Sequence, residues 1–155
     1  MRESRTNRHV EEVSSRRSLS EYKASPELSS KFVERAEIVA FPCDQVLFRL
    51  GEAAKRVYFV LKGEVWLLLP VSKESAVGFR AEYGSLIGLQ AAFGNEPFSM
   101  TAVASADSEI AVMESEEFCQ MVESNSALSM DALRIVVAEN RAARIAINQA
   151  SQGCH

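Results

Sequence analysis

Short apolar segments with a period of two alternate with glycine-containing turns from residue 37 to residue 113, and no other feature constrains the fold as tightly. The most apolar of them, residues 56–62, places Val57, Phe59 and Leu61 on one face. Segments of this length and spacing favour an all-β barrel or jelly roll over a sheet built from βαβ units. The expected strands are residues 38–41, 45–50, 56–62, 64–69, 76–83, 99–105 and 109–113.

A helical pattern precedes the strands. Ser25 suits an N-cap and Pro26 suits the first position of a helix. Leu28, Phe32 and Ala36 then recur at a spacing of four, which is the spacing of one helical face. A short amphipathic helix is therefore expected to start at residue 26.

Two further helices are expected after the strands. Ser115 is predicted to cap the first. Its apolar face is formed by Phe118, Met121 and Val122. The second opens at Asn125 or Ser126 and runs over about residues 128–149, a stretch without Gly or Pro. The predicted fold is mainly β with flanking helices: a jelly-roll β-roll, or double-stranded β-helix, followed by a long C-terminal helix.

The pattern divides the chain into three parts. Residues 1–24 are rich in Arg, Ser and Glu and contain too few apolar residues to order themselves, so we expect a mobile polar tail. Residues 25–125 form the β-roll with its short flanking helices, and residues 126–155 hold the long helix and a short tail. A chain of 155 residues can bury one core of useful size.

Charge and hydropathy argue against a DNA-binding, a membrane-spanning and a secreted protein. The net charge is −4, which argues against duplex DNA or an anionic membrane as the main partner. The longest apolar run, residues 65–71, is interrupted by Pro70 and is too short to span a bilayer. The N-terminal residues are charged and lack the apolar core of a secretory signal. A cytoplasmic protein is expected.

The sequence contains few residues suited to catalysis or to metal binding. The two histidines, His9 and His155, lie in the terminal segments, which removes the usual general base from the folded body. Cys43, Cys119 and Cys154 form no CxxC pair. We therefore expect no catalytic site, no metal site and no cofactor, haem and iron–sulfur clusters included.

The residues "FPCDQVLFRLGEAAKRVYFVLKGEVWLLL" resemble the first half of a cyclic-nucleotide-binding domain, and "SEIAVMESEEFCQMVESN" resembles its last strand and following helix. Gly51 and Glu52 match the family's Gly-acid turn, and Gly63 matches its next glycine. The resemblance covers about residues 26–147 and is of the catabolite-activator and fumarate-nitrate-regulator type. It implies a ligand pocket in the roll and a regulatory role.

Gly84 and Gly88 lie where the family places the glycines of its phosphate-binding cassette, but two expected side chains are missing. The family's Glu that binds the ribose 2′-hydroxyl is replaced by Leu89, and its Arg that pairs with the cyclic phosphate is replaced by Phe98. A buried phosphate needs a charged partner or many donors, and Arg is the best supplier. The resemblance thus implies a pocket without its usual nucleotide contacts.

Some pocket contacts remain. Gln90, Ala91 and Ala92 are expected to form the short helix whose N–H groups face the phosphate in relatives, and Ser99 follows the lost Arg. Arg80 on the preceding strand is a candidate replacement cation. Three outcomes stay open: a collapsed pocket, a less charged ligand, or a cyclic nucleotide held by altered contacts. The direction of Phe98 discriminates, because a ring that points inward fills the pocket.

The long helix has two apolar seams with heptad spacing. One is Ile135, Ala138, Ala142 and Ile145, and the other is Leu133, Val137, Asn140, Arg144 and Ile147. Together they cover more arc than packing on one side of a roll requires. Since this helix pairs with its twin in relatives, the resemblance implies a homodimer through it, in which Asn140 would fix the register.

Relatives of this type that regulate transcription continue into a helix-turn-helix, and no recognition helix fits in residues 148–155. Direct binding of nucleic acid is therefore not expected, and a heterodimer with a related regulator is a further hypothesis. The leading functional prediction is a non-enzymatic regulatory or interaction module that does not bind cyclic AMP by the usual Glu and Arg contacts. The alternative is a small-molecule sensor that signals through a dimerising C-terminal helix.

Overall fold

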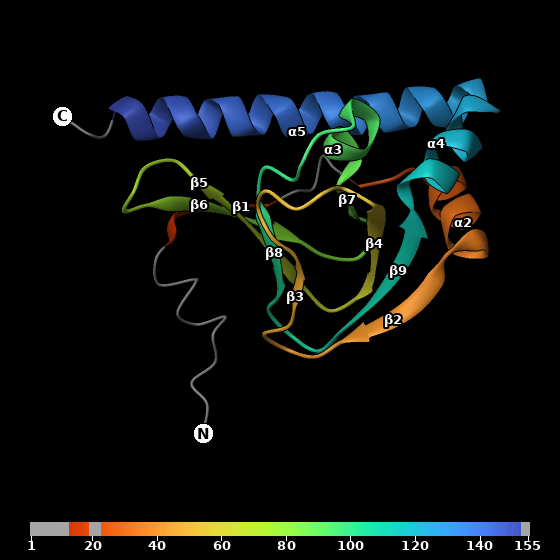
Figure 1. Cartoon of the computed structure of the whole chain (residues 1–155), viewed down its shortest axis with the longest axis horizontal. Helices are drawn as coiled ribbons and strands as arrows, with labels where there is room; N and C mark the ends of the chain where they lie inside the picture. Colours follow the sequence, from red (N-terminus) through yellow and green to blue (C-terminus); the bar gives the residue numbers. More distant parts are fainter. Residues whose placement is uncertain (1–12, 19–22, 153–155) are drawn as a thin grey trace.

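The computed structural model describes residues 13–18 and 23–152 and forms a β-roll with a long helix lying along one side (Figure 1). The elements in chain order are β1 (Val13–Ser18), α2 (Pro26–Arg35), β2 (Glu37–Phe41), β3 (Val46–Phe48), β4 (Arg56–Lys62), β5 (Val65–Pro70), β6 (Ala76–Ala81), β7 (Leu86–Ile87), α3 (Leu89–Gly94), β8 (Thr101–Ala104), β9 (Ser108–Glu114), α4 (Ser115–Glu123) and α5 (Ser126–Gln152).

Two sheets make up the roll. One has the strand order β1-β6-β5-β8-β3 and the other has the order β2-β9-β4-β7. All pairings are antiparallel except that of β1 with β6, which is parallel. Consecutive strands alternate between the sheets, as in a jelly roll, except β5 and β6, which are neighbours in one sheet; the predicted fold class is confirmed.

Strand β4 is buried on both faces and links the roll to its helices. Tyr58 points to the opposite sheet, where its ring lies 5.4 Å from that of Phe48. Phe59 points the other way, and its ring lies 5.9 Å from that of Phe32 on α2. Phe32 also lies 5.8 Å from Phe118 on α4. The outer face of this sheet is therefore covered by α2 and α4. Their predicted apolar residues are buried, except Ala36, which is the partly buried C-cap of α2.

The start of α2 is fixed by the predicted cap. The Ser25 hydroxyl accepts a hydrogen bond from the Leu28 N–H at 3.1 Å, and Pro26 occupies the first turn. The Ser25 N–H also donates to the Asp131 carboxylate at 2.9 Å. Arg134 donates to the same carboxylate at 2.7 Å. These bonds anchor the first turns of α5 to the start of α2.

Several predicted boundaries shift. Strand β3 spans only Val46–Phe48 within the predicted 45–50, and β6 ends at Ala81 rather than at Tyr83. The N-cap of α4 is Glu114, because the Ser115 hydroxyl donates instead to the Ala54 carbonyl at 2.9 Å. The second of the two predicted starts for the last helix is correct: α5 begins at Ser126, and the Asn125 side chain accepts from the next N–H groups.

The predicted mobile tail needs one correction. Residues 13–18 form β1, which pairs with β6 along its length. Pairing with a sheet edge satisfies backbone N–H and C=O groups whatever the side chains are, so a polar segment can add a strand. The other predicted tail residues, 1–12 and 19–22, lie outside the described residues, as do residues 153–155.

The turn between β4 and β5 requires its glycine. Gly63 has a φ of +93°, and a Cβ there would clash with the Ser108 hydroxyl and lie 2.7 Å from the Asp107 carbonyl. The glycine therefore allows β4 and β5 to approach the β8–β9 turn closely.

In the part of the chain that the structure describes, no helix has the length and apolar character needed to cross a membrane.

Candidate functional site

The candidate pocket lies where β7 leads into α3. Gly88 has a φ of +95° and caps α3, so the chain turns sharply from the strand into the helix. A Cβ on Gly88 would lie 3.2 Å from the ring of Phe98. Because Gly88 has no side chain, the Phe98 ring can pack directly against the backbone at the start of α3.

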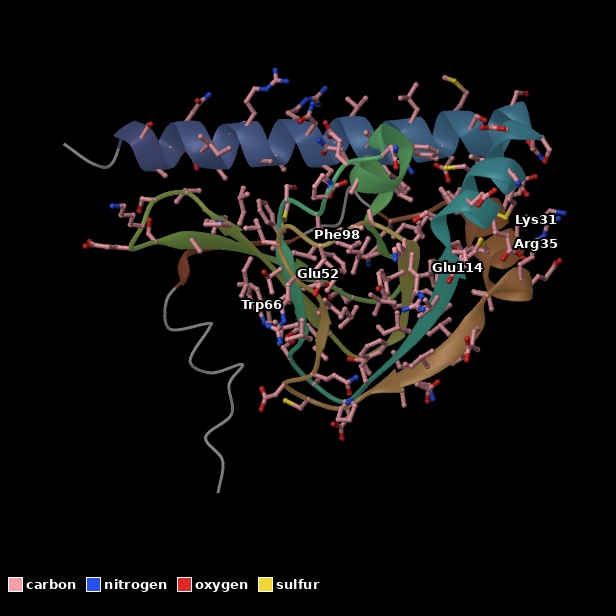
Figure 2. All side chains as sticks on the ribbon, in the orientation of Figure 1. Lys31, Arg35, Glu52, Trp66, Phe98 and Glu114 are labelled. Carbon is pink, nitrogen blue, oxygen red and sulfur yellow. The ribbon has the colours of Figure 1, made fainter. Side chains whose placement is uncertain are left out.

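Phe98 points into the roll. Its side chain is 5% exposed, and its ring stacks on that of Phe48 with centroids 3.7 Å apart and planes 16° apart. In Figure 2 Phe98 lies within the roll, below α5. Its backbone is held on both sides: the Phe98 N–H donates to the Glu52 carbonyl at 2.9 Å, and the Gly51 N–H donates to the Phe98 carbonyl at 2.8 Å. The ring is therefore a fixed part of the core.

The space left beside this stack is a cavity of about 20 Å³. It is lined by Phe48, Leu67, Ile87, Gly88, Gln90, Ala91, Phe98, Ser99, Met100 and Glu139. That volume suits one water molecule. Pockets that hold drug-sized ligands measure roughly 300–1,000 Å³, so a nucleotide does not fit without rearrangement.

The predicted pocket residues separate into two groups. Gly88, Gln90, Ala91, Phe98 and Ser99 line the cavity together. Leu89 is fully buried but belongs to the hydrophobic core, and Ala92 packs against that core, so neither lines the cavity.

The structure does not bring Arg80 to this cavity. Its side chain is on the exposed face of β6, where it forms ion pairs with Glu64 at 3.6 Å and Glu82 at 4.0 Å. Strand alternation explains this result, because Phe79 and Ala81 on either side of Arg80 point into the roll.

The sequence interpretation missed Glu139, which reaches the cavity from α5. Burial raises the pKa of the Glu139 carboxyl to about 7. The signal was present: Glu139 interrupts the apolar face that contains Ile135, Ala142 and Ala146 at helical spacing. It is the only charged residue among those lining the cavity.

The sequence matches the family described as "Cyclic nucleotide-binding domain" over residues 38–125. The chain belongs to this family. The match runs from the second residue of β2 to the residue before α5, so it includes the whole candidate pocket except Glu139.

Solved structures agree on the fold of this cyclic nucleotide-binding domain. The catabolite activator protein of Thermus thermophilus is 18% identical with a TM-score of 0.69, over 82% of this chain and 60% of that chain. The c-di-GMP responsive global regulator CLP of Xanthomonas campestris is 15% identical with a TM-score of 0.68, over 83% of this chain and 63% of that chain. A cyclic nucleotide-binding protein of Geobacter metallireducens is 21% identical with a TM-score of 0.58, over 76% of this chain and 86% of that chain.

The chain therefore spans about three fifths of the first two of these proteins, 60% and 63% of their lengths. At these identities the likeness concerns the fold alone. No curated protein matches the sequence.

The two predicted seams of α5 have different surroundings in this cyclic nucleotide-binding domain. Ile135 is fully buried, and Ala138 and Ala142 pack against the core, so most of the first seam faces the domain itself. The opposite face is exposed. We call the heptad series Met130, Leu133, Val137, Asn140, Arg144 and Ile147 the outer seam; its four apolar members are between 47% and 66% exposed.

Proposed function

We propose that this chain is a non-enzymatic regulatory module in which the nucleotide pocket is filled by the protein's own side chains. Its output is the outer seam of α5, which pairs with a second copy of the chain. The domain then acts as a scaffold that presents a dimerisation helix, and cyclic AMP is not its ligand.

The observation that carries this proposal is the stack of Phe98 on Phe48. The two rings occupy the middle of the roll and leave a cavity of about 20 Å³. A sensor with altered contacts would need the Phe98 ring to point outward, and the ring points inward. The filled pocket is therefore favoured over the sensor.

Electrostatics supports the same reading. A cyclic phosphate at this position would meet no cation among the residues that line the cavity, and it would face the Glu139 carboxyl. Losing a charge-assisted partner in a partly buried site costs about 2–5 kcal/mol. That loss weakens binding by roughly 30- to several-thousand-fold.

The outer seam supports the dimer. Met130, Leu133, Val137 and Ile147 expose apolar surface at the 3–4 spacing by which two parallel helices pack together. Asn140 occupies an exposed seam position, where an amide pair selects one register at some cost in stability. Arg134 and Arg141 flank a groove of about 420 Å³ beside this seam.

A thermal-shift titration tests the filled pocket. Cyclic AMP, cyclic GMP and cyclic di-GMP, each raised to millimolar concentration, should leave the melting temperature unchanged, with 5′-AMP as the control for non-specific phosphate binding. A ligand at one hundred times its dissociation constant would stabilise the fold by about 2.7 kcal/mol. That corresponds to roughly 5–10 °C for a domain of this size, and such a rise with one nucleotide would contradict the proposal.

A further inference from the structure

A groove beside α2, on the outer face of the sheet that contains β4, is much larger than the cavity beside Phe98. Its volume is about 560 Å³, against about 20 Å³ for that cavity. Pockets that hold small ligands measure roughly 300–1,000 Å³, so the groove has room for one. We call it the α2 groove. Helix α2 contributes Pro26, Ser29, Ser30 and Val33 to its lining, and the segment after β6 contributes Tyr83 and Gly84.

The deepest surface of the α2 groove is apolar. Phe59 of β4 is 1% exposed, and its ring meets the ring of Tyr83 edge to face at 6.2 Å. Leu61 of β4 and Val33 of α2 are partly buried and pack against the core. Tyr83 is 63% exposed, so its ring stands at the side of the groove and not in the core. An aliphatic group that enters the groove therefore gains apolar contacts on several sides.

Lys23 supplies the only charge among the described residues that line the groove. Its aliphatic stem lies over Gly84, because a Cβ on Gly84 would be 3.6 Å from the Lys23 Cδ. Within the part of the chain that the structure describes, the Lys23 ammonium forms no ion pair. The two acids of α2, Glu27 and Glu34, do not line the groove. The groove thus has one positive charge without a partner, which favours an anionic group of single charge.

Two serine hydroxyls stand beside this charge. Ser29 and Ser30 share a helical stripe with Pro26 and Val33, at the spacing of three and four that lines one face. Neither hydroxyl has a hydrogen-bond partner among the residues that the structure describes. A serine within a helix often bonds back to a carbonyl of the preceding turn, and these two do not. They are therefore available to donate to a ligand.

Hydrogen bonds of the backbone hold the edges of the groove in place. The Ala24 N–H donates to the Gly84 carbonyl at 2.9 Å, and the Gly84 N–H donates to the Val60 carbonyl at 3.0 Å. The Lys23 carbonyl accepts from the Arg134 guanidinium at 3.1 Å. A ligand would not have to order this backbone when it binds, and that lowers the entropic cost of binding.

From these contacts we propose that the α2 groove binds an aliphatic monocarboxylate. The alkyl chain lies against Phe59 and Leu61, and the carboxylate accepts hydrogen bonds from the Lys23 ammonium and the Ser29 hydroxyl. The site goes beyond the proposed function, since it requires neither the filled pocket nor the pairing of α5. An effect of the ligand on pairing, by way of Arg134, would rest on the proposed function.

Calorimetric titration of the full chain with sodium hexanoate, octanoate and decanoate, each below its micelle concentration, tests the site. Each buried methylene should tighten binding roughly three- to fourfold, so affinity should rise about tenfold from one acid to the next. Amide NMR should show saturable shifts in residues 23–30, 59–61 and 83–84 and none in residues 88–99. No binding of decanoate, or shifts confined to other residues, would overturn the proposal.

Two lysine variants separate the site from non-specific binding of an amphiphile. Lys23→Met keeps the stem over Gly84 but removes the charge, and it should weaken octanoate binding about 5- to 20-fold. Lys31→Met is the matched control, because Lys31 is exposed on the outer side of α2 (Figure 2) and does not line the groove. It should bind octanoate as the wild type does. Equal affinities for Lys23→Met and the wild type would contradict the proposal.

A variant that fills the groove gives an independent test. Ser30 is exposed, so Ser30→Trp should keep the melting temperature while its indole occupies the space and abolishes octanoate binding. Unchanged binding in this variant would show that the acid lies elsewhere. Cyclic AMP in the same titration distinguishes the two proposals. Its binding would contradict the filled pocket alone, and a failure of every acid to bind would contradict the α2 groove alone.

Discussion

Replacing Phe98 with alanine should lower the free energy of unfolding by about 3–5 kcal/mol, the cost of deleting a fully packed aromatic ring. The ring is 5% exposed and stacks on Phe48 at 3.7 Å, so the substitution leaves a cavity that the surrounding strands cannot fill. The melting temperature should fall by about 10 °C. Urea denaturation measures the change directly, with a lower midpoint and an unchanged slope.

Phe93→Ala is the matched control for this prediction. Phe93 lies on α3, close to Phe98 in sequence, but its side chain is 42% exposed, and its ring lies 5.8 Å from that of Phe118. Its removal should cost well under half as much. Equal losses for the two variants would mean that Phe98 does not fill the roll, and the account of the pocket would be wrong.

Introducing two acids into the outer seam should abolish self-association. In Leu133→Asp with Val137→Asp, two carboxylates on each helix would be buried against two on the other, while the nearest cations, Arg134 and Arg141, lie at the edge of the seam. A loss of about 3 kcal/mol raises the dissociation constant roughly 100-fold. Sedimentation equilibrium measures this change, and circular dichroism checks that the helix content is kept.

Ile145→Asp is the control for the seam. Ile145 is 43% exposed on the same helix but lies off the outer seam, so its substitution should change the dissociation constant little. A double variant that associates as the wild type does, or a stronger effect at Ile145 than at Leu133 and Val137, would place the interface elsewhere. A wild-type chain that stays monomeric at hundreds of micromolar would exclude the homodimer.

The strand pattern could be predicted from sequence because it depends on local periodicity. Residues 56–62 form β4 with the predicted bounds, and the Ser25 cap and Pro26 start are found as expected. The two-residue strand β7 could not be predicted, because two residues carry no periodicity. Strand β1 was missed for a different reason, since its pairing uses backbone groups and not side-chain pattern.

The candidate site was predicted only in part. The positions of Leu89 and Phe98 came from the family resemblance, but whether the Phe98 ring filled the pocket depended on tertiary packing with Phe48, fifty residues away in sequence. Glu139 was missed because its role depends on how α5 lies across the roll. The way α5 packs on the roll also decides which of its two apolar seams is buried. The heptad pattern in the sequence shows both seams but does not distinguish the buried one from the exposed one.

The most direct test of the filled pocket is the amide NMR spectrum of the chain with cyclic AMP at millimolar concentration. If Phe98 and Phe48 occupy the site, the amides of residues 88–99 should keep their chemical shifts, with no saturable change at Gly88, Gln90 or Ser99. Saturable shifts confined to those residues would show that a nucleotide enters the roll, and the proposal that the pocket is filled would then be wrong.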